Sequence, residues 1–96
     1  MFEVTKISDT VRDGRRTASF QTCGAVCSQQ IDIALEGNII REVRFTKGCN
    51  GNTQGISRLC VGRTPAEVIG CLEGIDCKAR GTSCPDQLAR ALRQLL

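Results

Sequence analysis

Cysteine is the residue type in this chain with the most scope for chemistry. The 96 residues include seven cysteines and no histidine. Without an imidazole there is no Ser–His or Cys–His pair and no histidine ligand, so the expected chemistry is that of thiolates. The count is odd, and the first residues lack a basic segment followed by an apolar one, which argues against a secreted disulfide scaffold. We therefore expect a cytoplasmic protein whose cysteines bind a metal or take part in redox reactions.

The seven cysteines divide into two groups by position. Cys60 and Cys71 fall on the apolar faces of two expected helices, where a free cysteine behaves as a small buried hydrophobe. The other five lie in expected loops or at the ends of elements, where partial exposure and a helix N-terminus favour the thiolate. These five are Cys23, Cys27, Cys49, Cys77 and Cys84. Four thiolates from separate loops can form a tetrahedral site that suits zinc or an iron–sulfur cluster.

The spacing of these cysteines supports a metal site only in part. Cys23 and Cys27 are close enough for a zinc knuckle, but the remaining intervals follow no standard zinc pattern. Cys49 lies in the loop TKGCNGNTQG, which matches neither GxxxxGK[ST] nor GxGxxG and so does not predict a phosphate site. We expect Asn50 or Asn52 to cap the helix that follows, with Gly51 supplying a positive φ. On this interpretation the loop presents Cys49 and does not hold a nucleotide.

The elements that must position these cysteines are strands first and helices second. Expected strands cover residues 2–7, 17–23, 30–36 and 39–47, with turns at Asp13-Gly14 and Gly37-Asn38. In the third of these strands apolar and polar residues alternate, as in a half-buried strand. In the fourth, Ile39, Val43 and Phe45 are expected to share one face.

Helical periodicity begins after the fourth strand. A short helix carries Ile56, Leu59 and Cys60 and ends at Gly62. The sequence Thr64-Pro65-Ala66-Glu67 is a capping box that opens a second helix, and Ser83-Cys84-Pro85-Asp86 opens a third, amphipathic one. We predict an α+β fold in one domain, residues 1–96: an antiparallel β-meander of three to four strands, followed by three helices packed on one face of the sheet.

The last of these helix starts also carries a family motif. Residues 82–86 read TSCPD, and the chain from about residue 22 onward resembles the small stand-alone members of the TSCPD-domain family. Other matching segments are GAVCS at 24–28, GCNGN at 48–52 and GIDC at 74–77, whereas Lys47 stands where a second glycine is expected. The resemblance implies a metal-ligand quartet of Cys27, Cys49, Cys77 and Cys84, with Cys23 as an extra ligand or redox partner. The residues expected to support the site are Gly48, Asn50, Gly51, Asn52, Ser83, Pro85 and Asp86.

The resemblance also implies a functional setting. The same domain occurs at the C-terminus of cobalamin-dependent ribonucleotide reductases, which implies an accessory role in ribonucleoside-diphosphate reductase chemistry and a reductase subunit as partner. A chain of 96 residues is too small to be the catalytic subunit by itself. The layout of elements is similar, more weakly, to that of U-type iron–sulfur scaffold proteins, with Cys27, Cys49 and Cys84 as the counterparts.

Three functional hypotheses follow. The first is a cysteine-ligated metal module that binds zinc in preference to an iron–sulfur cluster. The second is a thiol–disulfide relay in which Cys84 or Cys49 attacks and Cys27 resolves. The third is a structural module, able to form homo-oligomers, with buried reduced cysteines. A net charge of +3 and the lack of Trp and Tyr argue against nucleic-acid binding, and no apolar run is long enough for a membrane span.

Overall fold

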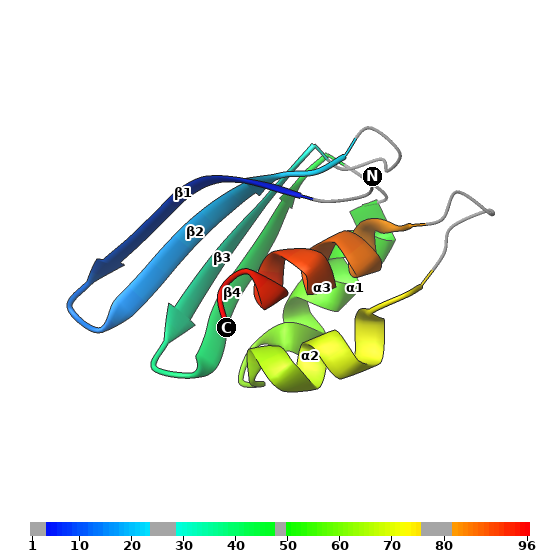
Figure 1. Ribbon diagram of the computed structural model, residues 1–96. Coiled ribbons are helices and arrows are strands. Elements are labelled where there is room, and N and C mark those ends of the chain that lie inside the picture. Colours follow the sequence, from blue (N-terminus) through cyan, green and yellow to red (C-terminus); the bar gives the residue numbers. More distant parts are fainter. Residues whose placement is uncertain (1–3, 24–28, 48–49, 76–81) are drawn as a thin grey trace.

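The computed structural model describes residues 4–23, 29–47, 50–75 and 82–96. Four strands come first in the chain: β1 (Thr5–Arg12), β2 (Arg15–Gln21), β3 (Gln30–Glu36) and β4 (Ile39–Thr46). They form one antiparallel sheet in the order β1-β2-β3-β4. The helices follow as α1 (Asn50–Cys60), α2 (Pro65–Leu72) and α3 (Cys84–Arg93), all on one side of the sheet (Figure 1). The predicted α+β fold is confirmed.

The two hairpins form where turn residues predicted them. Asp13 and Gly14 both have positive φ, at 52° and 78°, so that Arg12 pairs with Arg15 across a two-residue turn. Gly37, with φ 61°, makes the corresponding turn between β3 and β4. Both turns match the right-handed twist of the strands they join, which sets the register of the meander.

A β-bulge in β4 changes which of its residues face the core. Leu35 pairs with Ile40 but Ala34 pairs with Glu42, so Arg41 is an extra residue in the strand. Ile40 is consequently fully buried, whereas Ile39 is only partly buried. The prediction that Ile39 shares a face with Val43 was therefore wrong, because the inserted residue reverses the alternation.

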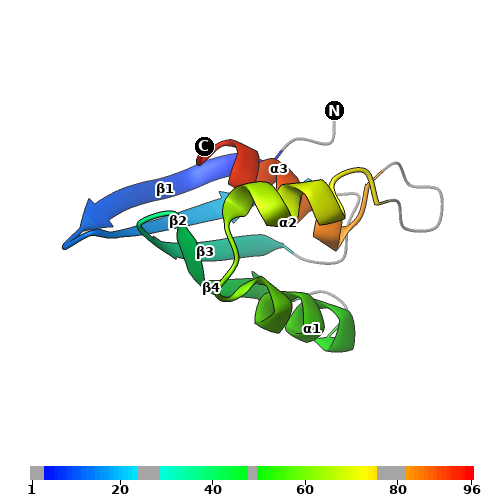
Figure 2. The ribbon, with the colours of Figure 1, turned by 90° about the horizontal axis from the view of Figure 1, so that it is seen from below.

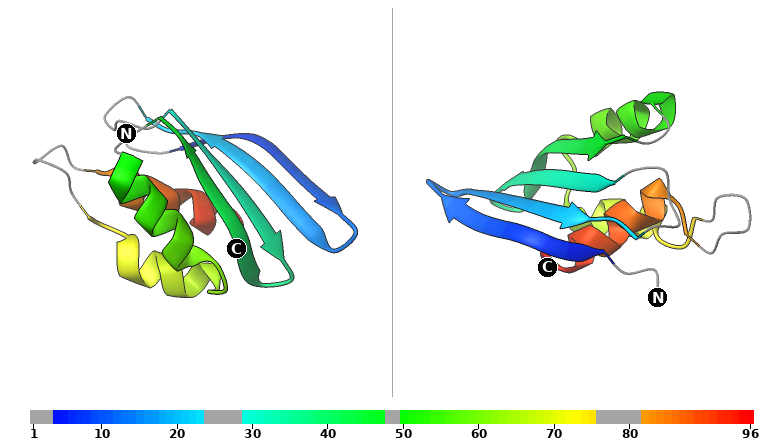
Figure 3. Two further views of the ribbon diagram at one scale, coloured as in Figure 1. Left: turned by 180° about the vertical axis from the view of Figure 1, so that it is seen from behind. Right: turned by 90° about the horizontal axis from the view of Figure 1, so that it is seen from above.

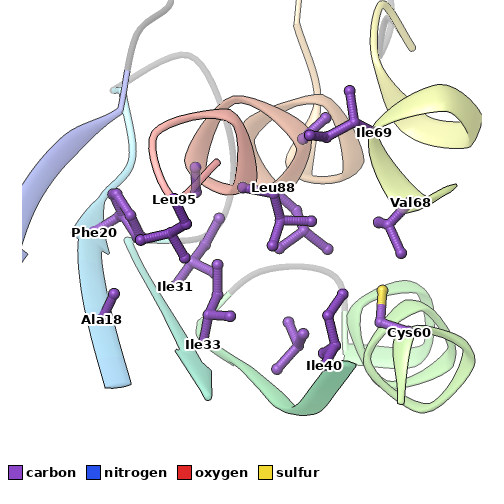
Figure 4. Close-up of a cluster of buried hydrophobic side chains, with 14 of the residues drawn as sticks. Ala18, Phe20, Ile31, Ile33, Ile40, Cys60, Val68, Ile69, Leu88 and Leu95 are labelled. Atoms are coloured by element: carbon purple, nitrogen blue, oxygen red, sulfur yellow. The ribbon is translucent and has the colours of Figure 1, made fainter. Parts of the chain in front are cut away.

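The core lies between the inner face of the sheet and α3 (Figure 4). Phe20, Ile31 and Ile33 project from the sheet toward Leu88 and its neighbours on α3. The sheet also contributes Ala18, Leu35, Ile40 and Val43, and α3 contributes Ala89, Ala91 and Leu92; Val4, just before β1, and Leu95, just after α3, belong to the same cluster. Burial of this apolar surface is the main term that stabilises the fold.

The other two helices pack at the side of this core. α1 packs along β4, and α2 packs on α3, as Figure 2 shows from below. The predicted capping box of α2 is confirmed, since the Glu67 N–H donates to Thr64 Oγ1 at 3.2 Å and the Thr64 N–H donates to Glu67 Oε1 at 3.1 Å. None of the helices in the described part of the chain has the length and apolarity that crossing a membrane demands.

The start of α1 differs from the prediction. The helix begins at Asn50, so Gly51 and Asn52 lie within its first turn and Gly51 does not supply a loop residue of positive φ. The residue that does adopt a left-handed conformation here is Lys47, with φ 60°. Glycine adopts this conformation without strain, which accounts physically for the glycine that the family resemblance led us to expect at this position.

Candidate cysteine site at the N-terminus of α3

The structure describes only part of the predicted site. Cys27, Cys49 and Cys77, together with Gly48, lie outside the described residues. Cys84 and Cys23 are described: Cys84 is buried and Cys23 is partly buried. The candidate site therefore consists of these two cysteines and the residues that contact them.

Cys84 is the first residue of α3, as predicted, but it is buried and not partly exposed. Its exposed fraction is 6%, and it belongs to an unbroken run of buried residues from Thr82 to Ala89. An ionised thiol in such a place needs a metal ion or hydrogen-bond donors to offset the loss of water. The N-terminus of a helix supplies part of that stabilisation through its aligned peptide dipoles.

Ser83 fixes the start of α3. It is the N-cap, and its Oγ accepts a hydrogen bond from the Asp86 N–H at 3.1 Å. The same hydroxyl donates to the carbonyl oxygen of Ile75 at 2.6 Å, which joins the chain beyond α2 to the start of α3. Pro85 lies in the first turn, where its missing N–H costs no helical hydrogen bond. Both residues therefore support the site, as predicted, by holding the helix start that carries Cys84.

Asp86 has a structural task that uses both of its carboxylate oxygens. Oδ1 accepts from the Gly74 N–H at 2.7 Å, and Oδ2 accepts from Thr82 Oγ1 at 2.5 Å and from Arg90 Nε at 2.8 Å. Burial opposes ionisation of this carboxyl, but the hydrogen bonds from Thr82, Arg90 and Gly74 outweigh it, so the pKa lies below its ordinary value. Asp86 thus ties the end of α2 to α3, and its oxygens are already engaged within the protein.

Gln87 is a member of this site that sequence reasoning missed. Its side chain is fully buried; Oε1 accepts from the Cys23 N–H at 3.0 Å, and Nε2 donates to Thr82 Oγ1 at 3.1 Å. The bond to Cys23 joins residues 64 positions apart in the chain. The sequence feature that could have indicated its role is that Gln87, a polar residue, lies next to Leu88 on the helix face that packs into the core.

The ends of several elements converge around Cys84. The Thr22 N–H donates to the Gln29 carbonyl at 3.1 Å, and the Gln29 N–H donates to the Thr46 carbonyl at 2.8 Å, so the ends of β2, β3 and β4 meet. The first residues of α1 and α3 and the last of α2 lie at this same end of the molecule (Figures 1 and 3). The described residues that flank the three intervals 24–28, 48–49 and 76–81 therefore lie close to one another at this end of the molecule.

Cys60 and Cys71, the two cysteines expected in the core, differ from each other in exposure. Cys60 is 3% exposed, as predicted, and burial raises the pKa of its thiol to about 11. Cys71 is exposed, which corrects the prediction of burial, because α2 turns Val68 and Ile69 toward the core instead. Both cysteines line an apolar groove of about 210 Å³ between α1 and α2. Among the described residues, no three Cys, Asp or Glu side chains are grouped closely enough to hold a metal ion.

A comparison with protein families identifies the relatives of this chain. No curated protein and no solved structure matches it. A family model for the TSCPD domain matches residues 5–96, almost the entire sequence. The motif from which the family takes its name is the buried start of α3, in which Ser83, Pro85 and Asp86 hold Cys84. The chain belongs to the TSCPD domain family.

Proposed function

We propose that this protein is a small metal-binding module in which cysteine thiolates hold a zinc ion, in preference to an iron–sulfur cluster, at the N-terminal end of α3. The observation that carries the proposal is the position of Cys84, buried at the end of the molecule where the described neighbours of 24–28, 48–49 and 76–81 meet. Those three intervals contain Cys27, Cys49 and Cys77. A tetrahedral site of four thiolates is the arrangement that zinc prefers in structural sites.

The donor set favours a soft metal. Asp86 is engaged by three hydrogen-bond donors, so the carboxylate nearest to Cys84 in the sequence is not free to bind a cation. The chain has no histidine. Thiolates alone suit zinc or iron–sulfur centres and not magnesium or calcium, which take oxygen ligands. When bound, such a metal would supply folding energy by joining separate loops, and Ser83 and Asp86 would hold Cys84 in place for it.

The setting of this module is proposed from the family. We infer an accessory role in ribonucleoside-diphosphate reductase chemistry, with a reductase subunit as partner and the cytoplasm as the compartment in which reduced thiols persist. A single domain with a thin core offers room for a metal module and none for a radical-generating barrel.

Two cysteine variants test the proposal. Protein purified without chelator should contain about one zinc per chain by elemental analysis. Cys84→Ser should lose the metal and unfold readily, because apparent zinc-binding energies of about 10–16 kcal/mol contribute to folding. Cys60→Ser, which changes a cysteine in the core, should keep the metal. Metal-free wild-type protein that is as stable as the purified form would overturn the proposal, as would retention of metal by Cys84→Ser.

A thiol–disulfide relay is the second candidate, and the link between Cys23 and the turn that carries Cys84 favours it. In a relay, the Cys84 or Cys49 thiolate would attack a disulfide of the partner, and Cys27 or Cys23 would resolve the mixed disulfide, leaving the partner with two thiols and this chain with one disulfide. Thiol titration separates the candidates. A relay loses two titratable thiols on mild oxidation, whereas a metal site masks its thiols until a chelator removes the metal.

A further inference from the structure

Gln87 links Cys23 to the turn of α3 that begins with Cys84. Its carboxamide is fully buried and bonded at both ends, to the Cys23 N–H at 3.0 Å and to Thr82 Oγ1 at 3.1 Å. Cys84 precedes Gln87 by three residues in α3, and residues at that spacing lie on the same face of a helix. The backbone of Cys23 is therefore held against the same turn of α3 that carries Cys84.

The link is rigid because the hydrogen bonds continue beyond it. Thr82 Oγ1 accepts from Gln87 and donates to Asp86 Oδ2, and Asp86 Oδ1 accepts from the Gly74 N–H. Each of these side chains is at least 99% buried, so the chain of bonds has little freedom to rearrange. The end of β2, the start of α3 and the end of α2 are thus held together by one polar network.

We propose that Cys23 supplies one of the thiolates of the metal site and that Gln87 is the positioning residue that holds it beside Cys84. This inference rests on the proposed metal site and refines its ligand set. With Cys27, Cys49 and Cys77, which lie outside the described residues, the proposed site has five candidate thiolates for the four positions of a tetrahedral zinc ion. If Cys23 takes one position, one of the three cysteines outside the described residues is dispensable for metal binding.

The first test compares single Cys→Ser variants. Zinc affinity is measured by competition with a chromophoric chelator, and the thiolate-to-metal absorption of the Co²⁺-loaded protein reports the number of sulfur ligands. Cys23→Ser should weaken zinc binding and lower that absorption by about a quarter, since one of four thiolates is lost. Cys71→Ser, at an exposed thiol on α2, should change neither. One of Cys27→Ser, Cys49→Ser and Cys77→Ser should retain wild-type affinity and absorption.

The second test isolates the positioning role of Gln87. Gln87→Met keeps the length of the side chain and removes the hydrogen bonds to Cys23 and Thr82. It should weaken zinc binding by about 10–100-fold, as loss of residues that orient metal ligands does. The matched control is Gln94→Met, which removes the bond from Gln94 Nε2 to the Val4 carbonyl at the other end of α3. That change should lower stability but leave zinc affinity unchanged.

A double-mutant cycle shows whether Gln87 acts through Cys23. Once Cys23→Ser has removed the ligand, Gln87→Met should weaken zinc binding no further, because there is no ligand left to position. Additive losses would overturn the positioning role, and Cys23→Ser with wild-type affinity and absorption would overturn the assignment of Cys23. Both of these failures leave a wild-type protein that binds zinc. A wild-type protein without metal would instead overturn the proposed function itself.

Discussion

Replacement of Cys60 by serine should destabilise the fold, whereas the same replacement at Cys71 should not. Cys60 is 3% exposed and points into the core beside Val68 and Ile40 (Figure 4), and Cys71 is exposed on α2. A serine at position 60 would bury a hydroxyl among apolar side chains, at a cost of about 1–3 kcal/mol if it finds no partner. The lower end applies if the hydroxyl donates to the carbonyl one turn earlier in α1. A surface change such as Cys71→Ser is usually within about 0.5 kcal/mol of neutral.

Urea unfolding of the two variants measures this difference, and thiol kinetics provide a second readout. For a domain of this size, each kcal/mol lost lowers the thermal midpoint by about 4–8 °C. The raised pKa of Cys60, about 11, leaves a thiolate fraction on the order of one in a thousand at pH 8. A disulfide reagent should therefore reach Cys60 only when the protein opens. Cys71→Ser should remove one rapidly reacting thiol, and Cys60→Ser should remove none.

Two results would refute this reasoning. Equal stability losses in the two variants would mean that α1 and α2 do not bury Cys60 as described. Loss of a rapidly reacting thiol in Cys60→Ser, with none lost in Cys71→Ser, would mean that the exposed and buried cysteines have been exchanged. Cys60→Ala serves as a control, because it removes the sulfur without introducing a hydroxyl and so separates the cost of lost packing from that of a buried polar group.

Three further changes test other parts of the structure. Asp86→Asn should destabilise the protein by about 2–4 kcal/mol in urea unfolding, because the charge-assisted bond from Arg90 is lost in a buried place; a loss below about 0.5 kcal/mol would contradict the network. Hydrogen bonds from Arg16 and Lys6 hold the pKa of Asp9 well below its ordinary value. The ionised Asp9 carboxylate should therefore stabilise the fold near neutral pH, and this stability should be lost as the pH falls from the ordinary pKa to the lowered pKa of the folded state. The urea midpoints of wild type and Asp9→Asn should then converge in acid, and a gap that widens would refute this sign. Lys47→Gly should raise the free energy of unfolding in urea by about 0.5–1 kcal/mol, because φ at this position is 60°; no gain would mean that the left-handed conformation carries no strain.

Local signals in the sequence were sufficient for the parts of the fold that local chemistry determines. The dipeptides at Asp13-Gly14 and Gly37-Asn38 predicted both hairpins, and alternation predicted β3 with its observed bounds, 30–36. The capping box at Thr64 predicted the first residue of α2. In each case the residues that determine the geometry lie within a few positions of one another, so no knowledge of packing was needed.

Predictions failed where packing decides between local alternatives. The extra residue at Arg41 could not be foreseen, because a bulge depends on pairing with β3 and leaves no mark in the pattern of β4 itself. Cys71 lies at helical spacing from Val68, yet α2 packs on α3 through a neighbouring part of its surface and leaves the thiol exposed. Periodicity identified an amphipathic helix in this case without fixing the direction in which its apolar stripe points.

The partners of the buried polar residues were the least predictable feature, and they bear most directly on function. Thr82 and Asp86 are four residues apart and could have been paired from sequence, but Gly74 reaches Asp86, and Cys23 reaches Gln87, only through the tertiary fold. The family motif is thereby largely explained by architecture: Thr82 and Asp86 build the network, and the motif's serine and proline start the helix. These tasks would be needed in any protein that starts a buried helix here. Cys84 is the motif residue whose thiol can bind a soft metal, and this is why the chemical proposal is placed on it.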